Sequence, residues 1–175
     1  MIPGVLISIA TFPGVIVHEM AHQLFCRLTR VAVFDVCYFR IGNPAGYVLH
    51  EPPQRQSQNL LIGIGPFLVN SLLAAIISSP AAIPILKFES GSFLDYVLIW
   101  LGISIGMHSF PSTGDANAIW ESVKRPDTSL FTKLVPVPLV GLIYVGAAGS
   151  VFWLDLAYGA AVAMFLPSLV VSLIA

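Results

Sequence analysis

Five apolar stretches, each about long enough to cross a lipid bilayer, constrain this chain more than any other feature. An α-helix needs about 20 mostly apolar residues to cross about 30 Å of hydrocarbon. The stretches that qualify cover residues 2–26, 59–79, 93–110, 134–154 and 156–175. Only 10% of the 175 residues are charged, which is too few to cover a water-facing surface. The sequence therefore predicts an all-α, polytopic membrane protein with about five transmembrane helices, folded as a single domain over residues 1–175.

The last two stretches are predicted to be separate helices, although no long polar segment divides them. Together they are about twice the length that one crossing needs. Trp153, Asp155 and Tyr158 lie at their junction, and aromatic residues are frequent where a helix reaches the membrane surface. We therefore expect an interfacial turn at these residues.

Basic residues are distributed unevenly among the predicted loops. Four arginines lie between the first and second spans, and Lys124, Arg125 and Lys133 lie between the third and fourth. Lys87 alone lies on the opposite side. Because cytoplasmic loops carry an excess of lysine and arginine, we expect the N-terminus outside and the C-terminus in the cytoplasm. The net charge of -1 gives no indication of a nucleic-acid partner.

The first predicted cytoplasmic loop has the composition of β-structure. Residues 31–50, VAVFDVCYFRIGNPAGYVLH, are rich in β-branched and aromatic side chains and contain a Gly-Asn-Pro-Ala-Gly turn. This pattern favours a small cytoplasmic β-hairpin that pairs residues 31–41 with residues 47–50. An irregular loop on the bilayer surface is the alternative.

Two short patterns predict how the helices bend and pack. Pro13 and Gly14 lie inside the first span, where they are expected to bend the helix. Gly102 and Gly106 form a small-x-x-x-small pair in the third span, which predicts close packing against neighbouring helices.

Residues 18–22 of the first span read His-Glu-Met-Ala-His, inside a segment where ionisable groups are costly to bury. His18 and His22 are four residues apart, so on a helix both imidazoles can reach one ion. Glu19 cannot share that geometry, but it can reach a water molecule bound to the same ion. This H-E-x-x-H spacing predicts a zinc site with Glu19 as general base. Satisfied polar residues in a helix bundle are the alternative interpretation.

A catalytic zinc ion takes three protein ligands and keeps one position open, so a third ligand is needed. A short helix is predicted over residues 115–124, beginning at Asp115. Asp115 could act as the N-cap of this helix or as a metal ligand, and its side chain cannot fully serve both roles at once. His108, at the end of the third span, is the competing ligand. Cys26 lies about 12 Å along the helix from His18, which is too far. We favour Asp115, because the predicted topology places it at the depth of the histidines, and we expect His108 to contact a ligand or the substrate.

At these residues the chain resembles the site-2 protease family of intramembrane metalloproteases. That family combines H-E-x-x-H in one span, a G-P-x-x-N type sequence in a middle span and an aspartate after a proline-broken later span. Here GPFLVN, which ends at Asn70, occupies the middle position, and the resemblance covers roughly residues 2–124. The resemblance implies these roles: zinc ligands His18, His22 and Asp115, catalytic base Glu19, and Asn70 near the substrate backbone.

The predicted function is zinc-dependent hydrolysis of a peptide bond in or near the membrane, with one zinc ion per chain. The expected partners are a transmembrane protein or peptide substrate and the lipid bilayer, and the sequence does not indicate an oligomeric state. Because the usual L-D-G sequence around the aspartate is absent, the alternative is a catalytically degenerate zinc-binding protein that acts as a binding or regulatory partner. A metal transporter ranks last, because the second, fourth and fifth spans supply no ionisable residues.

Overall fold

A computed structural model describes residues 4–124, 134 and 136–174 of the chain. The protein is mostly helical, with one two-stranded sheet. In chain order the elements are α1 (Gly4–Ala10), α2 (Phe12–Leu28), β1 (Val33–Cys37), β2 (Tyr47–His50), α3 (Gln56–Phe88), α4 (Phe93–Met107), α5 (Thr113–Val123), α7 (Pro136–Gly149), the 3₁₀-helix η1 (Ser150–Phe152), α8 (Leu154–Ala160), the π-helix η2 (Ala161–Phe165) and α9 (Leu166–Ile174). Arg125 and Lys133, which contribute to the predicted orientation, lie outside the described residues.

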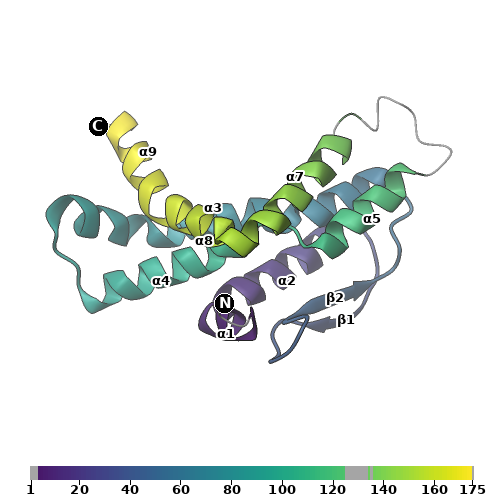
Figure 1. Cartoon of the computed structure of the whole chain (residues 1–175), viewed down its shortest axis with the longest axis horizontal. Helices are drawn as coiled ribbons and strands as arrows, with labels where there is room; N and C mark the ends of the chain where they lie inside the picture. Colours follow the sequence, from purple (N-terminus) through teal and green to yellow (C-terminus); the bar gives the residue numbers. More distant parts are fainter. Residues whose placement is uncertain (1–3, 125–133, 135, 175) are drawn as a thin grey trace.

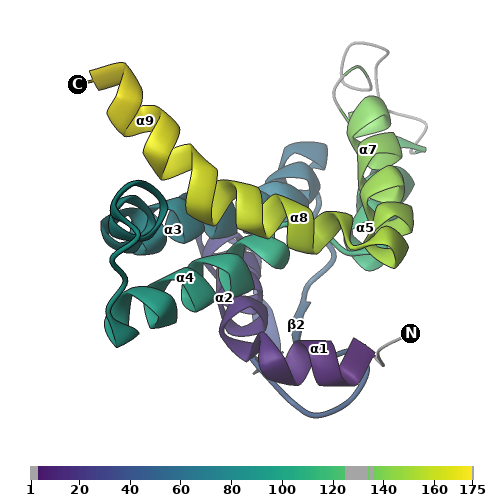
Figure 2. The ribbon, with the colours of Figure 1, turned by 60° about the vertical axis from the view of Figure 1, so that its left-hand side comes forward.

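Three runs of helix, the passes α3, α4–α5 and α7–α9, extend along the long axis of the molecule, and the shorter α2 packs against α3 and α4 (Figures 1 and 2). α3 runs from one end to the other as a single helix, and α4 followed by α5 returns in the opposite direction. α7 then runs to the middle of the molecule, and α8, η2 and α9 continue toward the end where α3 turns into α4. The C-terminal helix therefore lies at the same end as the α3–α4 turn.

This arrangement differs from the five separate spans that the sequence predicts. Within the described residues, α3 is the one helix that is long and apolar enough to cross a membrane by itself. α1 and α2 reach that length only together, and they are bent by 86° relative to each other. α4 and the apolar segments Pro136–Gly146 and Leu154–Leu169 are shorter than a full span. The prediction of about five full-length transmembrane helices is therefore not confirmed.

The last two predicted spans, 134–154 and 156–175, form the two halves of one broken pass instead of an antiparallel pair. Between them the chain forms η1, and Trp153 adopts a left-handed backbone conformation with a φ of 62°. A hydropathy pattern gives the length of an apolar segment but not the direction in which the chain leaves it. The turn expected at the membrane surface lies in the middle of the molecule instead (Figure 1).

The bend between α1 and α2 lies at Thr11, close to the predicted position at Pro13 and Gly14. Pro13 lies in the first turn of α2, where a helix tolerates a residue without an N–H group. Ser104 of α4 bridges the break: the Gly14 N–H donates to its hydroxyl over 3.1 Å, and the hydroxyl donates to the Thr11 carbonyl over 2.9 Å. Contacts with α4 therefore hold the bend, which turns α1 away from the line of α2.

α3 is longer than the predicted second span, 59–79. It covers 33 residues, about 50 Å at 1.5 Å per residue, and continues through Pro80 and Pro84. Prolines are tolerated inside helices in apolar surroundings, where neighbouring groups satisfy the freed backbone atoms. A third proline in this helix, Pro66, lies beside the candidate site.

β1 and β2 form the predicted hairpin after α2. The strands pair antiparallel, with Val36 opposite Val48 and Cys37 opposite Tyr47, and the register is irregular between Val33 and Asp35. The hairpin packs against α2, which places its loop beside the centre of the molecule.

Gly102 and Gly106 bring α4 into close contact with its neighbours, as predicted. A methyl group at Gly102 would lie 2.8 Å from Ser78 Cβ in α3, and one at Gly106 would lie 2.9 Å from Gly159 Cα in α8. These distances leave no room for a side chain. The three passes therefore pack tightly at the centre of the molecule, next to the site.

Candidate metal site

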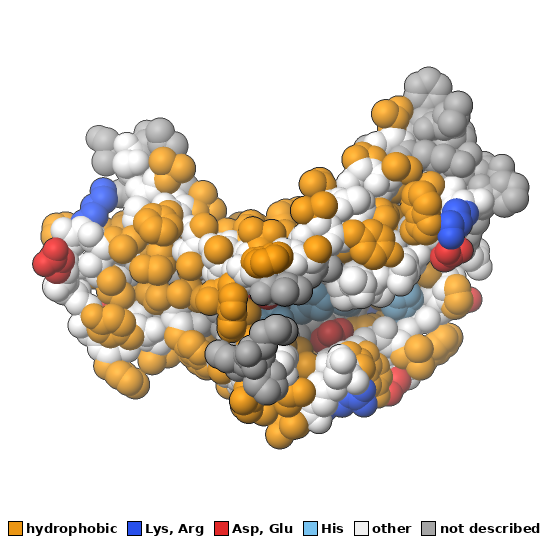
Figure 3. All heavy atoms as spheres, viewed as in Figure 1, with side chains coloured by type: hydrophobic (Ala, Val, Ile, Leu, Met, Phe, Trp, Pro, Cys, Tyr) orange, Lys and Arg blue, Asp and Glu red, His pale blue; other side chains and the backbone are white. Residues whose placement is uncertain are grey.

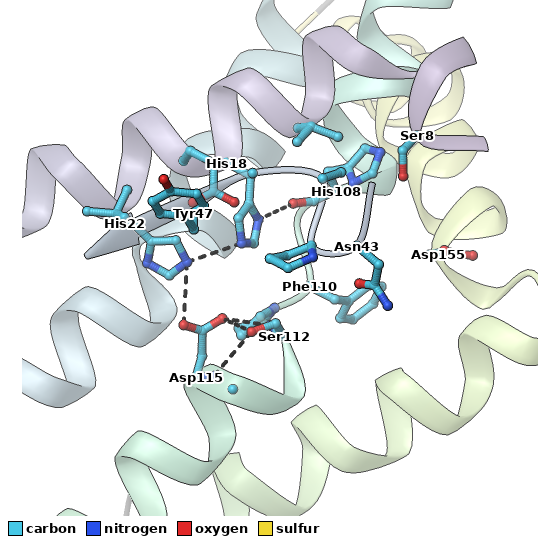
Figure 4. Close-up of a pocket in the computed structure, with 18 of the residues that line it drawn as sticks. Ser8, His18, His22, Asn43, Tyr47, His108, Phe110, Ser112, Asp115 and Asp155 are labelled. Atoms are coloured by element: carbon cyan, nitrogen blue, oxygen red, sulfur yellow. Dashed lines mark hydrogen bonds and ion pairs between the residues drawn. The ribbon is translucent and has the colours of Figure 1, made fainter. Parts of the chain in front are cut away.

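Three predicted ligands meet at the centre of the molecule, where α2 faces the first turn of α5 (Figure 4). The Nε2 atoms of His18 and His22 are 3.1 Å apart, and His22 Nε2 lies 3.4 Å from Asp115 Oδ1. One ligand atom from each of the three residues lies within 4.8 Å of the others. Among the described residues, no second group of histidine, cysteine or acidic side chains converges in this way.

Backbone carbonyls fix the orientation of both imidazole rings. His18 Nδ1 donates to the carbonyl of His108 over 2.7 Å, and His22 Nδ1 donates to the carbonyl of Ile62 over 3.0 Å. Because a carbonyl only accepts, each Nδ1 carries a proton, and each neutral ring presents an unprotonated Nε2 to the centre. Two nitrogen lone pairs and a carboxylate oxygen then face one another, and a cation at their centre would relieve the repulsion.

Both carbonyls lack a hydrogen-bond donor within their own helix. In a regular helix the Ile62 carbonyl would accept from the N–H of residue 66, but Pro66 has none. His108 is the C-cap of α4, and the last carbonyls of a helix have no partner within it. The proline of the GPFLVN sequence therefore frees the acceptor that orients His22.

Asn70 lies behind the ligands and ties three helices together. Its side chain is fully buried, and Nδ2 donates to the carbonyls of Gly14, Ile105 and His108 over 3.3, 3.2 and 3.0 Å. These bonds join α3 to α2 and α4 at the level of the site. Asn70 is not among the described residues that line the cavity, so it holds the backbone of this protein, whereas the resemblance implied a substrate backbone.

Asp115 combines two roles that the sequence alone presents as alternatives. α5 begins at Thr113 with Ser112 as its N-cap, so the prediction that Asp115 begins this helix is wrong. Asp115 Oδ2 accepts from the backbone N–H and the hydroxyl of Ser112, each over 2.7 Å, while Oδ1 faces His22. One carboxylate oxygen completes a capping box and the other remains available as a ligand. The expected conflict between the two roles is therefore absent.

The donor set and its spacing fit a catalytic zinc ion. Zinc binds histidine nitrogen and carboxylate oxygen, and catalytic sites use three protein ligands with a fourth position open. Two ligands bound at about 2.0–2.1 Å to a tetrahedral ion lie about 3.3–3.4 Å apart. Two of the three separations, 3.1 and 3.4 Å, are close to this value, and all three ligand atoms lie within 4.8 Å of one another.

Glu19 and the three ligands line one cavity of about 540 Å³. Glu19 is 9% exposed, and the loop between β1 and β2 lies against it, because a methyl group at Gly46 would lie 2.7 Å from Glu19 Cγ. Tyr47 of the hairpin also lines the cavity. Its hydroxyl donates to Asp35, and this bond raises the pKa of the phenol, so Tyr47 stays protonated. The hairpin therefore forms one wall of the cavity, beside the proposed general base.

His108 lines the same cavity, but its ring points away from the ligands (Figure 4). Its Nε2 lies 2.8 Å from the Thr11 hydroxyl, which donates to the Ile7 carbonyl over 2.7 Å. The His108 ring therefore supports the bend between α1 and α2, and its backbone carbonyl orients His18. This geometry favours Asp115 over His108 as the third ligand.

Three parts of the cavity were not predicted from the sequence: Ser112, Gly46 and Asp155. The spacing Ser112-x-x-Asp115 is that of a capping box, so this pair could have been recognised. Gly46 and Asp155 reach the cavity through the packing of distant elements, and no local pattern signals such a contact.

No protein-family model, curated protein or solved structure matches this chain. The resemblance to site-2 proteases therefore stays a prediction from short motifs. The geometry of His18, Glu19, His22 and Asp115 is the main indication of function.

The first prediction concerns Pro66, which leaves the Ile62 carbonyl free for His22. Pro66→Ala introduces an N–H group that competes with His22 for the Ile62 carbonyl. Zinc affinity should therefore fall about tenfold, which is the lower end of the effect of removing a hydrogen bond that supports a metal ligand. Zinc titration of purified protein measures this. Pro80→Ala, in the same helix but away from the site, is the matched control and should bind zinc as the wild type does. Equal affinity in both variants would contradict this role of Pro66.

The second prediction separates the two candidates for the third ligand. Asp115→Ala removes a carboxylate oxygen from the group and should lower zinc affinity severely, whereas His108→Ala keeps the backbone carbonyl that orients His18 and should retain the metal. Metal content after dialysis against a weak chelator distinguishes them. Loss of zinc in His108→Ala together with retention in Asp115→Ala would indicate a three-histidine site.

Proposed function

We propose that this protein is a zinc-dependent intramembrane endopeptidase. The observation that supports this most directly is the convergence of His18, His22 and Asp115 beside Glu19, in a cavity inside an apolar helical protein. Figure 3 shows histidine and acidic side chains at the bottom of a hollow in a largely apolar face. Ionisable groups in such surroundings are costly and serve a function by default.

The three ligands would hold the metal, and Glu19 would move the proton. When bound, zinc acidifies a water molecule and polarises the carbonyl under attack. Glu19 is beside the ligands and is not needed as one. Its carboxylate accepts the proton of the attacking water and delivers it to the nitrogen of the leaving amine. Burial under Gly46 protects this step from bulk water.

A transmembrane substrate would have to unwind so that a backbone carbonyl reaches the metal. Unwound backbone needs hydrogen-bond partners inside a membrane. The edge of the β1–β2 hairpin, whose loop lines the cavity, would supply them by strand pairing.

We further propose that the chain is a multi-pass integral membrane protein. Large apolar side chains on the outside of α3, α4 and α7, such as Leu72, Phe93 and Leu142, are more than 60% exposed, as expected of a lipid-facing surface. Basic residues gather at the end of the molecule where α2 ends and α3 begins, and this end would face the cytoplasm. The site would then open toward the cytoplasmic half, and the C-terminus would lie with Lys87 on the outer side.

A catalytically inactive zinc-binding partner protein is the alternative. It is favoured by the contact between the hairpin loop and Glu19, since a substrate would have to share that space. Protein that holds one zinc ion but does not hydrolyse any transmembrane peptide, in detergent or in lipid, would support it.

The third prediction tests the role of Glu19. Glu19→Gln keeps the size of the side chain and removes the base, so it should retain zinc and lose hydrolysis by about 100-fold or more. Zinc content and cleavage of a transmembrane peptide are measured on the same preparation. Near-normal turnover in this variant would remove Glu19 from the mechanism.

The fourth prediction tests the three-pass arrangement. Single cysteines at Lys87, Ser172 and Lys124, in a chain without Cys26 and Cys37, are treated with an impermeant thiol reagent in intact cells. Positions 87 and 172 should react before permeabilisation, and position 124 only after it. If positions 172 and 124 both react only after permeabilisation, the C-terminus is cytoplasmic, as the five predicted spans imply. That result would contradict the three-pass arrangement.

A further inference from the structure

Asp155 is the one acidic or basic residue between positions 134 and 174 of the sequence, and it lines the cavity that contains the metal ligands. It lies in the first turn of α8, on the far side of the cavity from His22 (Figure 4). The sequence suggested a place at the membrane surface for this residue. The structure places it instead in the middle of the broken third pass.

The break itself faces the cavity. η1 and the left-handed Trp153 interrupt the pass between α7 and α8, and the flanking residues Ser150 and Asp155 contribute to the cavity wall. Irregular backbone within a membrane is tolerated only where it is buried in protein or lines a polar cavity. Broken helices of this kind often mark the place where a membrane protein binds its substrate.

The charge of Asp155 has no balancing partner within the described chain. Asp155 Oδ1 accepts from the adjacent Leu156 N–H, and no lysine or arginine of the described residues pairs with it. None of the described residues that line the cavity is a lysine or arginine. By contrast, Asp115 Oδ2 accepts two hydrogen bonds from Ser112, and Asp115 Oδ1 lies among the candidate metal ligands. Asp155 is half-buried, and a cation that binds beside it would form a charge-assisted hydrogen bond with its carboxylate.

We propose that Asp155 is a specificity-determining residue that binds an ammonium or guanidinium group of the substrate. The proposal rests on the proposed function, because it assumes that the peptide occupies this cavity. Ser8 and Asn43 lie at the same end of the cavity as Asp155 (Figure 4), and Ser150 also lines the cavity. The oxygen atoms of these side chains are suitable acceptors for such a cation. Substrates of this enzyme therefore carry a basic group a short distance from the cleaved bond.

Binding of peptides to the zinc-loaded Glu19→Gln protein tests the proposal without requiring turnover. The probes are Nα-acetylated apolar peptides that differ at one scanned position, where they carry lysine, glutamine or glutamate. At one position, lysine should bind about tenfold more tightly than glutamine, a preference typical of a partly buried ion pair. Adding Asp155→Asn should reduce this preference to near one, and Asp155→Lys should favour glutamate. Glu89→Gln, an exposed acid on the far end of α3, is the matched control and should leave the preference unchanged.

A non-acetylated peptide without lysine identifies the source of the cation. If it binds more tightly than its acetylated form, and only when Asp155 is present, the cation is the terminal amine. Equal weakening of all peptides by Asp155→Asn, or a lysine preference that survives this change, would overturn the proposal. Failure of the proposed function is distinct: an Asp155-dependent preference in a protein whose wild type never hydrolyses these peptides would keep the binding site and remove the protease.

Discussion

The hydrogen bonds from His18 and His22 to two backbone carbonyls are the interactions on which the site depends. They place the protons on Nδ1 and leave two Nε2 lone pairs facing the Asp115 carboxylate. Inside an α-helix almost every backbone carbonyl accepts a hydrogen bond within its own helix. Here a proline in α3 and the end of α4 leave two of them free. The candidate metal site therefore depends on these two freed carbonyls as much as on the ligand side chains.

Breaks between helices also shape the rest of the fold. α1 and α2 are separated by a bend that Ser104 holds, α4 and α5 are separated by the capping box of Ser112 and Asp115, and α7 and α8 are separated by η1. All three interruptions lie near the centre of the molecule, where they surround the cavity (Figures 1 and 4). Asn70 joins three of the helices behind the cavity.

Local patterns predicted which side chains converge better than they predicted the architecture. The spacing of His18 and His22 fixes their geometry on any helix, and the alternation of residues 31–50 was sufficient for the hairpin. The third ligand followed from the proline-broken end of α4, although Ser112 was overlooked as the N-cap. The passes of the chain were not predictable in the same way, since apolar length does not reveal whether two neighbouring helices fold back or run on. For this reason Asp155 was assigned to the membrane surface instead of to the cavity.

Zinc K-edge X-ray absorption of the purified wild-type protein tests the central claim most directly. The account predicts one zinc ion per chain, a first coordination shell of nitrogen and oxygen only at about 2.0–2.1 Å, and the outer-shell signature of two imidazoles. A sulfur scatterer at about 2.3 Å would indicate ligation by Cys26 or Cys37. That result, or protein that binds no zinc in stoichiometric amount, would contradict a site formed by His18, His22 and Asp115.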